Sequence, residues 1–227
     1  VEVLDDKFDG SQTWTSNYIG NVGNAVDNDM MTVETLFAGQ LTMMINGTAQ
    51  KAWVIIKHED IASDDDDFTN GLPKIFIPCG RDRDDDGGKI AYWAWFTSRV
   101  LDYAQTLPCL NMKQAAVMGG SRLGKTALVA GMLDTRFRYA FSVVSGCGGA
   151  AITRKKVGET VAEICKRFPY WFCENYQKYI DRESEMPFDQ HFLIASIAPR
   201  YVSVNSAIED TWADPLSEML SCIAASE

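Results

Sequence analysis

The stretch around Ser121 contains residue types at a spacing that can perform nucleophilic chemistry. Residues Ala115–Ala127 read AAVMGGSRLGKTA, so an apolar run leads into a glycine-rich turn and then into an amphipathic helix. The G-x-S-x-x-G pattern that begins at Gly119 is close to a nucleophile elbow, in which a strained turn exposes a serine hydroxyl beside an oxyanion-binding N–H. The same residues also match the G-x-x-x-x-G-K-T pattern of a phosphate-binding loop.

The apolar runs that follow favour the hydrolase over the nucleotide-binding protein. A phosphate-binding loop needs a later strand that ends in Asp to hold magnesium, but the run Ala140–Val144 is followed by SGCGG. A further apolar run, Arg200–Asn205, is followed by Glu209 and Asp210. Hydrolases of the α/β type place serine, acid and histidine in that order along the chain. We therefore favour a serine esterase, with a P-loop nucleotide-binding protein and a glycine-rich turn without chemistry as alternatives.

Five segments in the right order resemble the glucuronoyl esterases, which are α/β-hydrolase carbohydrate esterases grouped with bacterial acetylxylan-esterase-like proteins. The segments are GGSRLGK from Gly119, SGCGGAA from Ser145, PFDQH from Pro187, IAPR from Ile197 and WADP from Trp212. The resemblance is continuous from about Lys89 to Glu227 and weak before that. It implies a serine carbohydrate esterase that hydrolyses a 4-O-methyl-glucuronate (glucuronoyl) ester, or a related xylan ester of lignocellulose, through an acyl-enzyme.

The resemblance also implies roles for individual residues. Ser121 is the nucleophile, and Arg122 supplies the oxyanion with a backbone N–H and with its side chain. Lys125, Glu159 and Trp212 match positions that contact the sugar. Two cations beside the ester of a sugar acid are physically reasonable, because they stabilise developing negative charge and bind hydroxyls. The alternatives are an ordinary helix-surface lysine for Lys125 and a packing role for Trp212.

The acid of the triad is assigned to Asp210. Many glucuronoyl esterases have Glu directly before the Ser-Gly-x-Gly-Gly segment, but here that position is Val144, which cannot orient an imidazole. Other members of the family place the acid after the next strand, two residues before a tryptophan. Asp210 stands two residues before Trp212, and Glu209 is the second choice.

No histidine follows the proposed acid. The sequence contains only His58 and His191, whereas a hydrolase with this order of residues carries its base on a loop after the acid. His191 belongs to the Asp-Gln-His segment, which has a structural role in the resembled family. We therefore expect that the chain lacks the C-terminal part of the fold. A catalytically inactive, carbohydrate-binding homologue is the alternative.

The composition is that of an ordinary globular domain. The 227 residues are 46% hydrophobic and 23% charged, which is enough for one sizeable core. We expect a single α/β-hydrolase domain over residues 1–227, with an irregular segment at 1–38 and the hydrolase core at 39–227. No apolar run is long enough to predict a membrane span.

Charge and cysteine usage limit the partners. The net charge of −10 argues against nucleic acid or an anionic membrane, although a locally basic site can still bind an anionic sugar. The expected partner is a small-molecule or polysaccharide ester. Six cysteines without a Cys-x-x-Cys motif indicate no metal site, and we expect no cofactor. The family implies a secreted or periplasmic protein, a cytoplasmic one is also compatible, and neither compartment nor oligomeric state follows from the sequence.

Alternating apolar residues predict strands before the first long helix. Leu41–Asn46 and Ala52–Lys57 predict a hairpin with Asn46-Gly47 in its turn, and Lys74–Pro78 predicts a further short strand. Strands that alternate with helices after Gly80 predict a doubly wound, mostly parallel sheet, with the hairpin on its antiparallel edge.

Helical spacing and acidic runs account for most of the rest. Lys89–Leu107 predicts an amphipathic helix that Pro108 ends, and Phe192–Ala198 predicts a buried helix. The aromatic stretch Phe168–Tyr179 predicts an inserted lid. Two acidic runs, Ser63–Asp67 and Arg81–Gly88, are interpreted as solvated surface loops, with calcium binding as the alternative.

Overall fold

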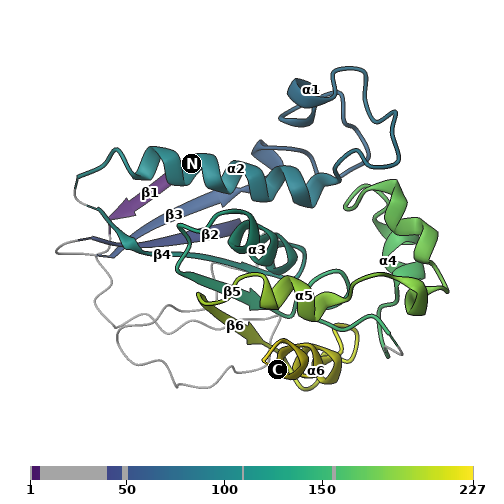
Figure 1. Ribbon diagram of the computed structural model, residues 1–227. Helices are drawn as coiled ribbons and strands as arrows, with labels where there is room; N and C mark the ends of the chain where they lie inside the picture. The colour runs from purple at the N-terminus through teal and green to yellow at the C-terminus, as the bar shows by residue number, and fades with distance from the viewer. Residues whose placement is uncertain (1, 6–39, 48–50, 109, 155–156, 227) are drawn as a thin grey trace.

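The computed structural model describes residues 2–5, 40–47, 51–108, 110–154 and 157–226, with side chains from Val54 onward. The described strands form one six-stranded sheet in the order β1-β3-β2-β4-β5-β6 (Figure 1). The strands are β1 (Glu2–Asp5), β2 (Gln40–Gly47), β3 (Lys51–Lys57), β4 (Leu110–Gly120), β5 (Tyr139–Val143) and β6 (Tyr201–Asn205).

One half of the sheet is antiparallel and the other half is parallel. β1 pairs with β3, β3 with β2 and β2 with β4 in antiparallel fashion, whereas β4, β5 and β6 are parallel neighbours. The predicted hairpin is confirmed as β2 and β3. Gly47 belongs to β2 rather than to the turn, and the connecting residues 48–50 lie outside the described residues.

The segment 1–38 was expected to be irregular, but Glu2–Asp5 forms β1 at the edge of the sheet, and the remainder lies outside the described residues. Four residues are too few to show a periodic pattern in the sequence. The strand is recognised only by its pairing with β3.

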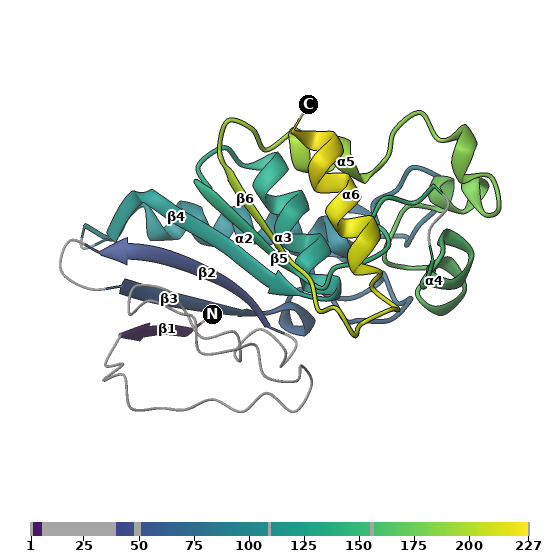
Figure 2. The ribbon, with the colours of Figure 1, turned by 90° about the horizontal axis from the view of Figure 1, so that it is seen from below.

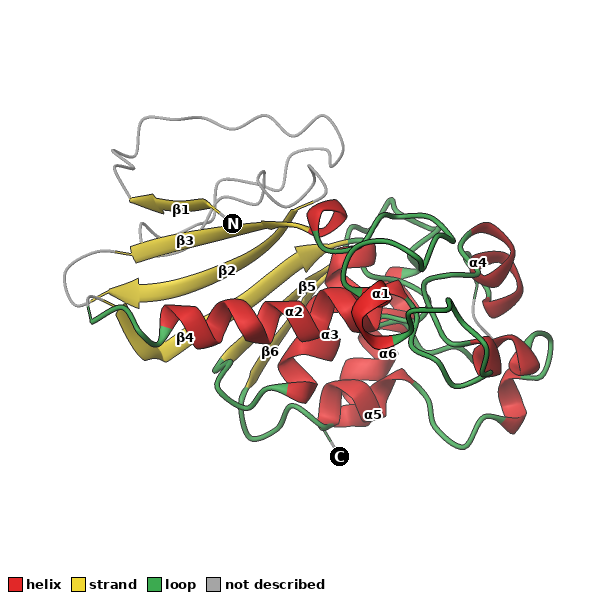
Figure 3. Ribbon diagram, turned by 90° about the horizontal axis from the view of Figure 1, so that it is seen from above, coloured by secondary structure: helices red, strands yellow, loops and turns green. Residues whose placement is uncertain are grey.

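Helices α2 and α3 cover one face of the sheet, as the views from below and from above both show (Figures 2 and 3). α3 packs against α2, α5 packs against α3, and α6 packs against α5. The α-helices are α1 (Pro73–Phe76), α2 (Lys89–Ala104), α3 (Arg122–Leu133), α4 (Val161–Arg167), α5 (Gln190–Ala195) and α6 (Pro215–Ala225). The 3-10 helices are η2 (His58–Asp60), η3 (Glu174–Tyr179) and η4 (Glu183–Glu185). Within the described part of the chain, no helix is long and apolar enough to cross a bilayer.

The core lies between the sheet and the helices α2 and α3. Trp93 and Leu101 of α2 and Leu123 and Leu128 of α3 are almost completely buried, and they belong to one hydrophobic cluster. Each such side chain contributes about 1.5–3 kcal/mol when it leaves water. The predicted helix from Lys89 is thus confirmed, and this packing fixes α3, which follows Ser121 directly.

One predicted element is wrong, and a second is shorter and less buried than expected. The expected strand at Lys74–Pro78 is instead the single-turn helix α1, with Pro73 at its first helical position. Ile75 and Phe76 of this helix are exposed. The expected buried helix at Phe192–Ala198 is the shorter α5, and Phe192 is 56% exposed. α5 nevertheless buries Ile194 against its neighbours, so only part of the apolar run faces the core.

Candidate active site

Ser121 lies at the tip of a sharp turn between β4 and α3. Its φ of 54° and ψ of −123° are a combination that non-glycine residues rarely adopt. The turn is held because Ser121 N–H donates to Val143 O at 2.8 Å. A Cβ at Gly119 would lie 2.1 Å from Leu123 O, so the turn also requires a glycine there. The Ser121 side chain is exposed, so the turn has the geometry of a nucleophile elbow.

The same turn lacks the free amides of a phosphate-binding loop. The N–H groups of Gly124 and Lys125 donate to Ser121 O at 2.9 and 3.2 Å, so they are already bonded within the first turn of α3. Lys125 is only 3% exposed, and its Nζ donates to Ser145 O. A phosphate-binding lysine reaches toward the phosphates instead. This arrangement argues against the nucleotide-binding alternative.

The C-terminal ends of the three parallel strands lie together, next to Ser121. Gly120 is in register with Val143, and Val143 with Asn205, so the residues after β4, β5 and β6 emerge side by side. Val144, directly after β5, has a φ of 41°, which costs a β-branched residue about 1–3 kcal/mol. Its apolar side chain has no acceptor for an imidazole N–H, so this exit from the sheet supplies no triad acid.

Arg122 is held by a carboxylate from the opposite side of the site. Its guanidinium forms an ion pair with Asp64 Oδ2, and Asp64 Oδ1 accepts a hydrogen bond from Trp171 Nε1 at 2.7 Å. Tyr170 Oη donates to the main-chain oxygen of Asp64 at 2.9 Å. The Asp64 side chain is only 10% exposed, so the pair is partly protected from water and positions the guanidinium.

Arg122 and Lys125 lie near the same indole ring. The guanidinium carbon of Arg122 is 5.0 Å from the Trp171 ring centroid, and Lys125 Nζ is 5.7 Å from it. Phe168 stacks on Trp171 with 3.8 Å between the ring centroids. The aromatic segment that was predicted to be a lid therefore packs against the two cations by cation–π contact. Both cations belong to the first turn of α3, which follows the exposed serine directly.

Two of the predicted sugar-contacting residues are joined through their backbones. Glu159 N–H donates to Trp212 O at 3.0 Å, and a Cβ at Gly158, which has a φ of 83°, would lie 2.3 Å from Thr211 O. Only glycine therefore permits this close approach. Glu159 is 6% exposed, whereas Trp212 is 39% exposed with the Arg167 guanidinium 4.4 Å from its ring.

Asp210 is the half-buried member of the candidate acid pair, and Glu209 is exposed. Asp210 lies on the loop that leaves the sheet after β6, and its Oδ1 accepts a hydrogen bond from Ala213 N at 3.0 Å. Its N–H donates to Ala207 O at 3.0 Å. These contacts agree with the preference for Asp210 over Glu209, and its role as triad acid stays a prediction.

The two histidines occupy packed positions. His58 is 4% exposed, its Nε2 is 3.8 Å from Asp64 Oδ2, and its ring meets Trp93 edge-on at 4.8 Å. His191 lies on α5 with its ring 4.3 Å from that of Phe192. The neighbouring Asp189 is fully buried and accepts hydrogen bonds from the Thr153 N–H and hydroxyl at 2.8 and 2.9 Å. Asp189 therefore has a structural role, whereas the structural role expected of His191 stays a prediction.

Sequence reasoning missed Asp64, because it treated the whole Ser63–Asp67 run as a solvated loop. Asp65 to Asp67 are exposed, but Asp64 faces Arg122 and Trp171. Nothing in a run of four identical residues marks the inward one. Asp64 is recognised as the inward residue only by its contact with Trp171, which is 107 positions away along the chain.

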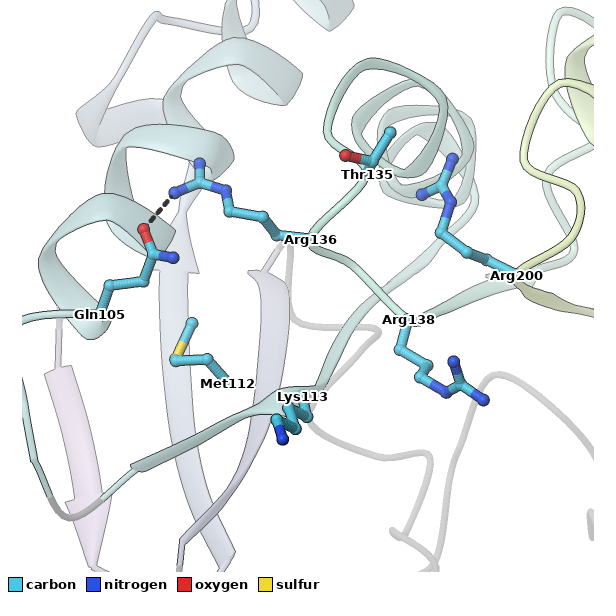
Figure 4. A pocket seen from close by; sticks show the side chains of 7 residues that line it. All are labelled: Gln105, Met112, Lys113, Thr135, Arg136, Arg138 and Arg200. Atoms are coloured by element: carbon cyan, nitrogen blue, oxygen red, sulfur yellow. Dashed lines mark hydrogen bonds between the residues drawn. The ribbon is translucent and has the colours of Figure 1, made fainter.

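A cavity outside this site lies at the other end of the parallel strands. A cavity of about 430 Å³ is lined by Gln105, Met112, Lys113, Thr135, Arg136, Arg138 and Arg200 (Figure 4). Arg138 and Arg200 directly precede β5 and β6, so this cavity lies at the sheet edge opposite Ser121. Across the residues that the structure describes, no group of three His, Cys, Asp or Glu side chains is arranged to hold a metal ion.

Comparison with known proteins places this geometry in a family. The family model described as "Glucuronyl esterase, fungi" matches residues 24–227. Carbohydrate esterase MZ0003 from an unknown prokaryotic organism is 46% identical over 166 residues, which cover 71% of this chain and 38% of that protein. The 4-O-methyl-glucuronoyl methylesterase 1 of Wolfiporia cocos is 31% identical over 73% of this chain and 42% of its own length. The solved glucuronoyl esterase from Solibacter usitatus superimposes with a TM-score of 0.71 at 41% identity, over 77% of this chain and 45% of that one.

The chain thus spans less than half the length of each of these three proteins. The matches confirm the predicted α/β-hydrolase fold. The residues matched by the family model include the serine turn, the strand exits and the segments around them. By its sequence and by its fold, the chain belongs to the glucuronoyl esterase family.

Proposed function

We propose that this protein is a serine carbohydrate esterase that hydrolyses a glucuronoyl ester, such as a 4-O-methyl-glucuronate ester. The observation that carries the proposal is Ser121, an exposed serine with a positive φ in a sharp turn, with Arg122 directly after it. The name of the Wolfiporia cocos relative, a 4-O-methyl-glucuronoyl methylesterase, supports this substrate class.

The chemistry proceeds through an acyl-enzyme. Ser121 Oγ attacks the ester carbonyl, and the Arg122 N–H and guanidinium stabilise the resulting oxyanion. Collapse of this intermediate releases the alcohol and leaves the uronoyl group on Ser121, and water then hydrolyses that ester. Loss of one oxyanion donor typically lowers kcat by about 10²–10³, so the Asp64 pair that positions Arg122 is important for the rate.

The sugar is bound by residues around the serine turn. Lys125 Nζ donates to Ser145 O, and from the family resemblance we assign its ammonium to the hydroxyls of the sugar acid. Trp212 offers a partly exposed ring face, and Glu159 lies beside it with acceptor oxygens. These three residues surround the ring of the sugar acid rather than the reacting carbonyl.

Of the residues that assist proton transfer at Ser121, we assign only one in this chain. Asp210, on the loop after β6, is the acid that would orient an imidazole. Neither His58 nor His191 follows Asp210, so we assign no residue of this chain as the base. A catalytically inactive, carbohydrate-binding protein is the second candidate, because Val144 stands where an acid could lie.

The test measures hydrolysis and binding separately. The chain is assayed on an aryl ester and a methyl ester of glucuronic acid, alongside Ser121→Ala and the control Ser184→Ala, which alters another exposed serine. Without an imidazole at Ser121, we expect an acceleration of only about 10³–10⁴ over water. This residual acceleration comes from the oxyanion donors and from binding, so the diagnostic change in Ser121→Ala is the loss of the acyl-enzyme, which intact-mass measurement detects and which Ser184→Ala should retain.

Binding of free glucuronic acid, followed by calorimetry, should change by less than about twofold in Ser121→Ala, because the serine acts on the carbonyl. An acyl group that still forms on Ser121→Ala would refute the proposed nucleophile. Binding without any acylation of Ser121 would favour the inactive homologue.

A further inference from the structure

A fully buried carboxylate lies behind the exits of the parallel strands. Glu218, on α6, is 0% exposed. Its Oε1 accepts hydrogen bonds from Gly146 N at 2.9 Å and from Ser145 Oγ at 3.3 Å, and its Oε2 accepts one from Ser206 Oγ. Burying a charge is costly unless every partner is in place, so these three contacts, from two different loops, are the reason that the carboxylate is tolerated.

The first loop is the one that holds Lys125. Ser145 Oγ also accepts hydrogen bonds from Ser142 Oγ at 2.7 Å and from Ala150 N at 2.9 Å, so the turn after β5 folds around this hydroxyl. Ser145 O in turn accepts the hydrogen bond of Lys125 Nζ. The position of the Lys125 ammonium thus depends on the turn that Glu218 fixes.

The second loop is the one that leads to Asp210. Ser206 directly follows β6, and the chain passes from there through Asp210 to Asp214, which caps α6 by accepting from Ser217 N at 3.1 Å. Glu218 and the cap therefore hold the two ends of this loop to the same helix. One side chain links the β5 exit to the β6 exit.

We propose that Glu218 is a positioning residue of the active site, which fixes Lys125 through Ser145 and fixes the start of the Asp210 loop through Ser206. Glu218 does not touch the substrate itself. The proposal rests on the proposed function of the site as far as sugar binding is concerned, whereas the link from Glu218 to Lys125 can be tested without any sugar.

The experiment compares three variants of the full chain. Glu218→Ala removes all three contacts, and Glu218→Gln keeps the shape but replaces charged hydrogen bonds by weaker neutral ones. The control is Ser221→Ala, one turn further along α6, where the residue is also fully buried and, within the described part of the chain, its Oγ has no hydrogen-bond partner. The control therefore alters the same helix without altering the strand exits.

Three measurements are made on each variant. Hydrogen exchange at Gly146 and Ala150 reports the β5 turn, reductive methylation of Lys125 quantified by peptide mapping reports its ammonium, and calorimetry reports affinity for methyl glucuronate. We expect exchange and methylation to be about tenfold faster in Glu218→Ala and about threefold faster in Glu218→Gln. Affinity should fall by similar factors, and Ser221→Ala should stay within about twofold of the wild type.

The outcomes separate positioning from simple stabilisation. Faster exchange with an unchanged Lys125 methylation rate overturns the proposal, because Glu218 then only stabilises its own turn. If Glu218→Ala does not fold, the test rests on Glu218→Gln, and unchanged hydrogen exchange in that variant also overturns the proposal. If the wild-type chain binds no glucuronate ester, the proposed function fails, and the methylation rates still decide whether Glu218 positions Lys125.

Discussion

Replacing Asp64 by alanine removes the carboxylate that joins Arg122 to Trp171, and the cost can be worked out from the contacts. Trp171 is 3% exposed, and its Nε1 donates to Asp64 Oδ1 at 2.7 Å. A buried donor left without an acceptor costs about 1–3 kcal/mol. The Arg122 side chain is 36% exposed, so its ion pair adds at most about 1 kcal/mol. We expect Asp64→Ala to lower the free energy of unfolding by about 2–3 kcal/mol.

Asp64→Asn should cost less, about 1 kcal/mol, because the amide oxygen can still accept the indole hydrogen bond while the ion pair is lost. The matched control is Asp66→Ala, two residues further along the same loop. Asp66 is exposed, so this change should stay within about 0.5 kcal/mol. Urea unfolding followed by tryptophan fluorescence measures all three free energies of unfolding.

A double-mutant cycle with Trp171→Phe tests the assignment directly. The two substitutions should couple by about 1 kcal/mol, because each removes one half of the same hydrogen bond. Equal costs for Asp64→Ala and Asp66→Ala would refute the argument that only the inward aspartate contributes. A coupling energy of zero would show that the indole does not depend on this carboxylate.

Three further predictions concern other parts of the fold. Gly158→Ala should destabilise the protein by at least about 2 kcal/mol more than Gly80→Ala, as measured by urea unfolding. Both glycines have a φ of 83°, but only a Cβ at Gly158 meets Thr211 O. Equal losses of stability in the two variants would contradict this. Burial alone would raise the pKa of Asp134, but its hydrogen bonds from Arg136 outweigh burial and hold that pKa below the ordinary value. Asp134 should therefore contribute its full stabilisation above about pH 4 and lose it as the pH falls through its lower folded-state pKa. In Asp134→Asn, the urea midpoint should then depend less on pH between about pH 5 and 2 than in the wild type. An equal decline of the midpoint in both proteins would count against this expectation. Burial raises the pKa of Cys165 to about 11, whereas Cys79 is exposed, so a thiol reagent at pH 8 should label Cys79 first and Cys165 only on unfolding, as peptide mapping would show.

The serine turn could be predicted from the sequence because its cause is local. Gly119 and Ser121 are two residues apart, and the strand before them and the helix after them have clear periodicity. The hairpin and α2 were predictable for the same reason. The strand expected at Lys74–Pro78 failed because apolar character alone does not distinguish a strand from a helical turn, and Pro73 favours the latter.

The surroundings of the serine could be predicted only in part. The resemblance drew attention to Arg122 and Lys125, whose roles stay predictions, but it did not predict that Trp171 would lie near both cations. Asp64 and Glu218 were not predicted at all, because an inward carboxylate is recognised by partners that are distant in the sequence. Such contacts are set by tertiary packing, which leaves no mark in local spacing.

The contact between Asp64 and Trp171 has a consequence for the order in which the molecule folds. The two residues are 107 positions apart, with β4, α3 and β5 between them. Closing so long a loop has an entropic cost, which is recovered only after the intervening elements have packed. We therefore expect the guanidinium of Arg122 to reach its final position late in folding, whereas the turn at Ser121 needs only neighbouring strands. A partly folded chain can already possess the nucleophile and still lack the oriented cation that makes it useful.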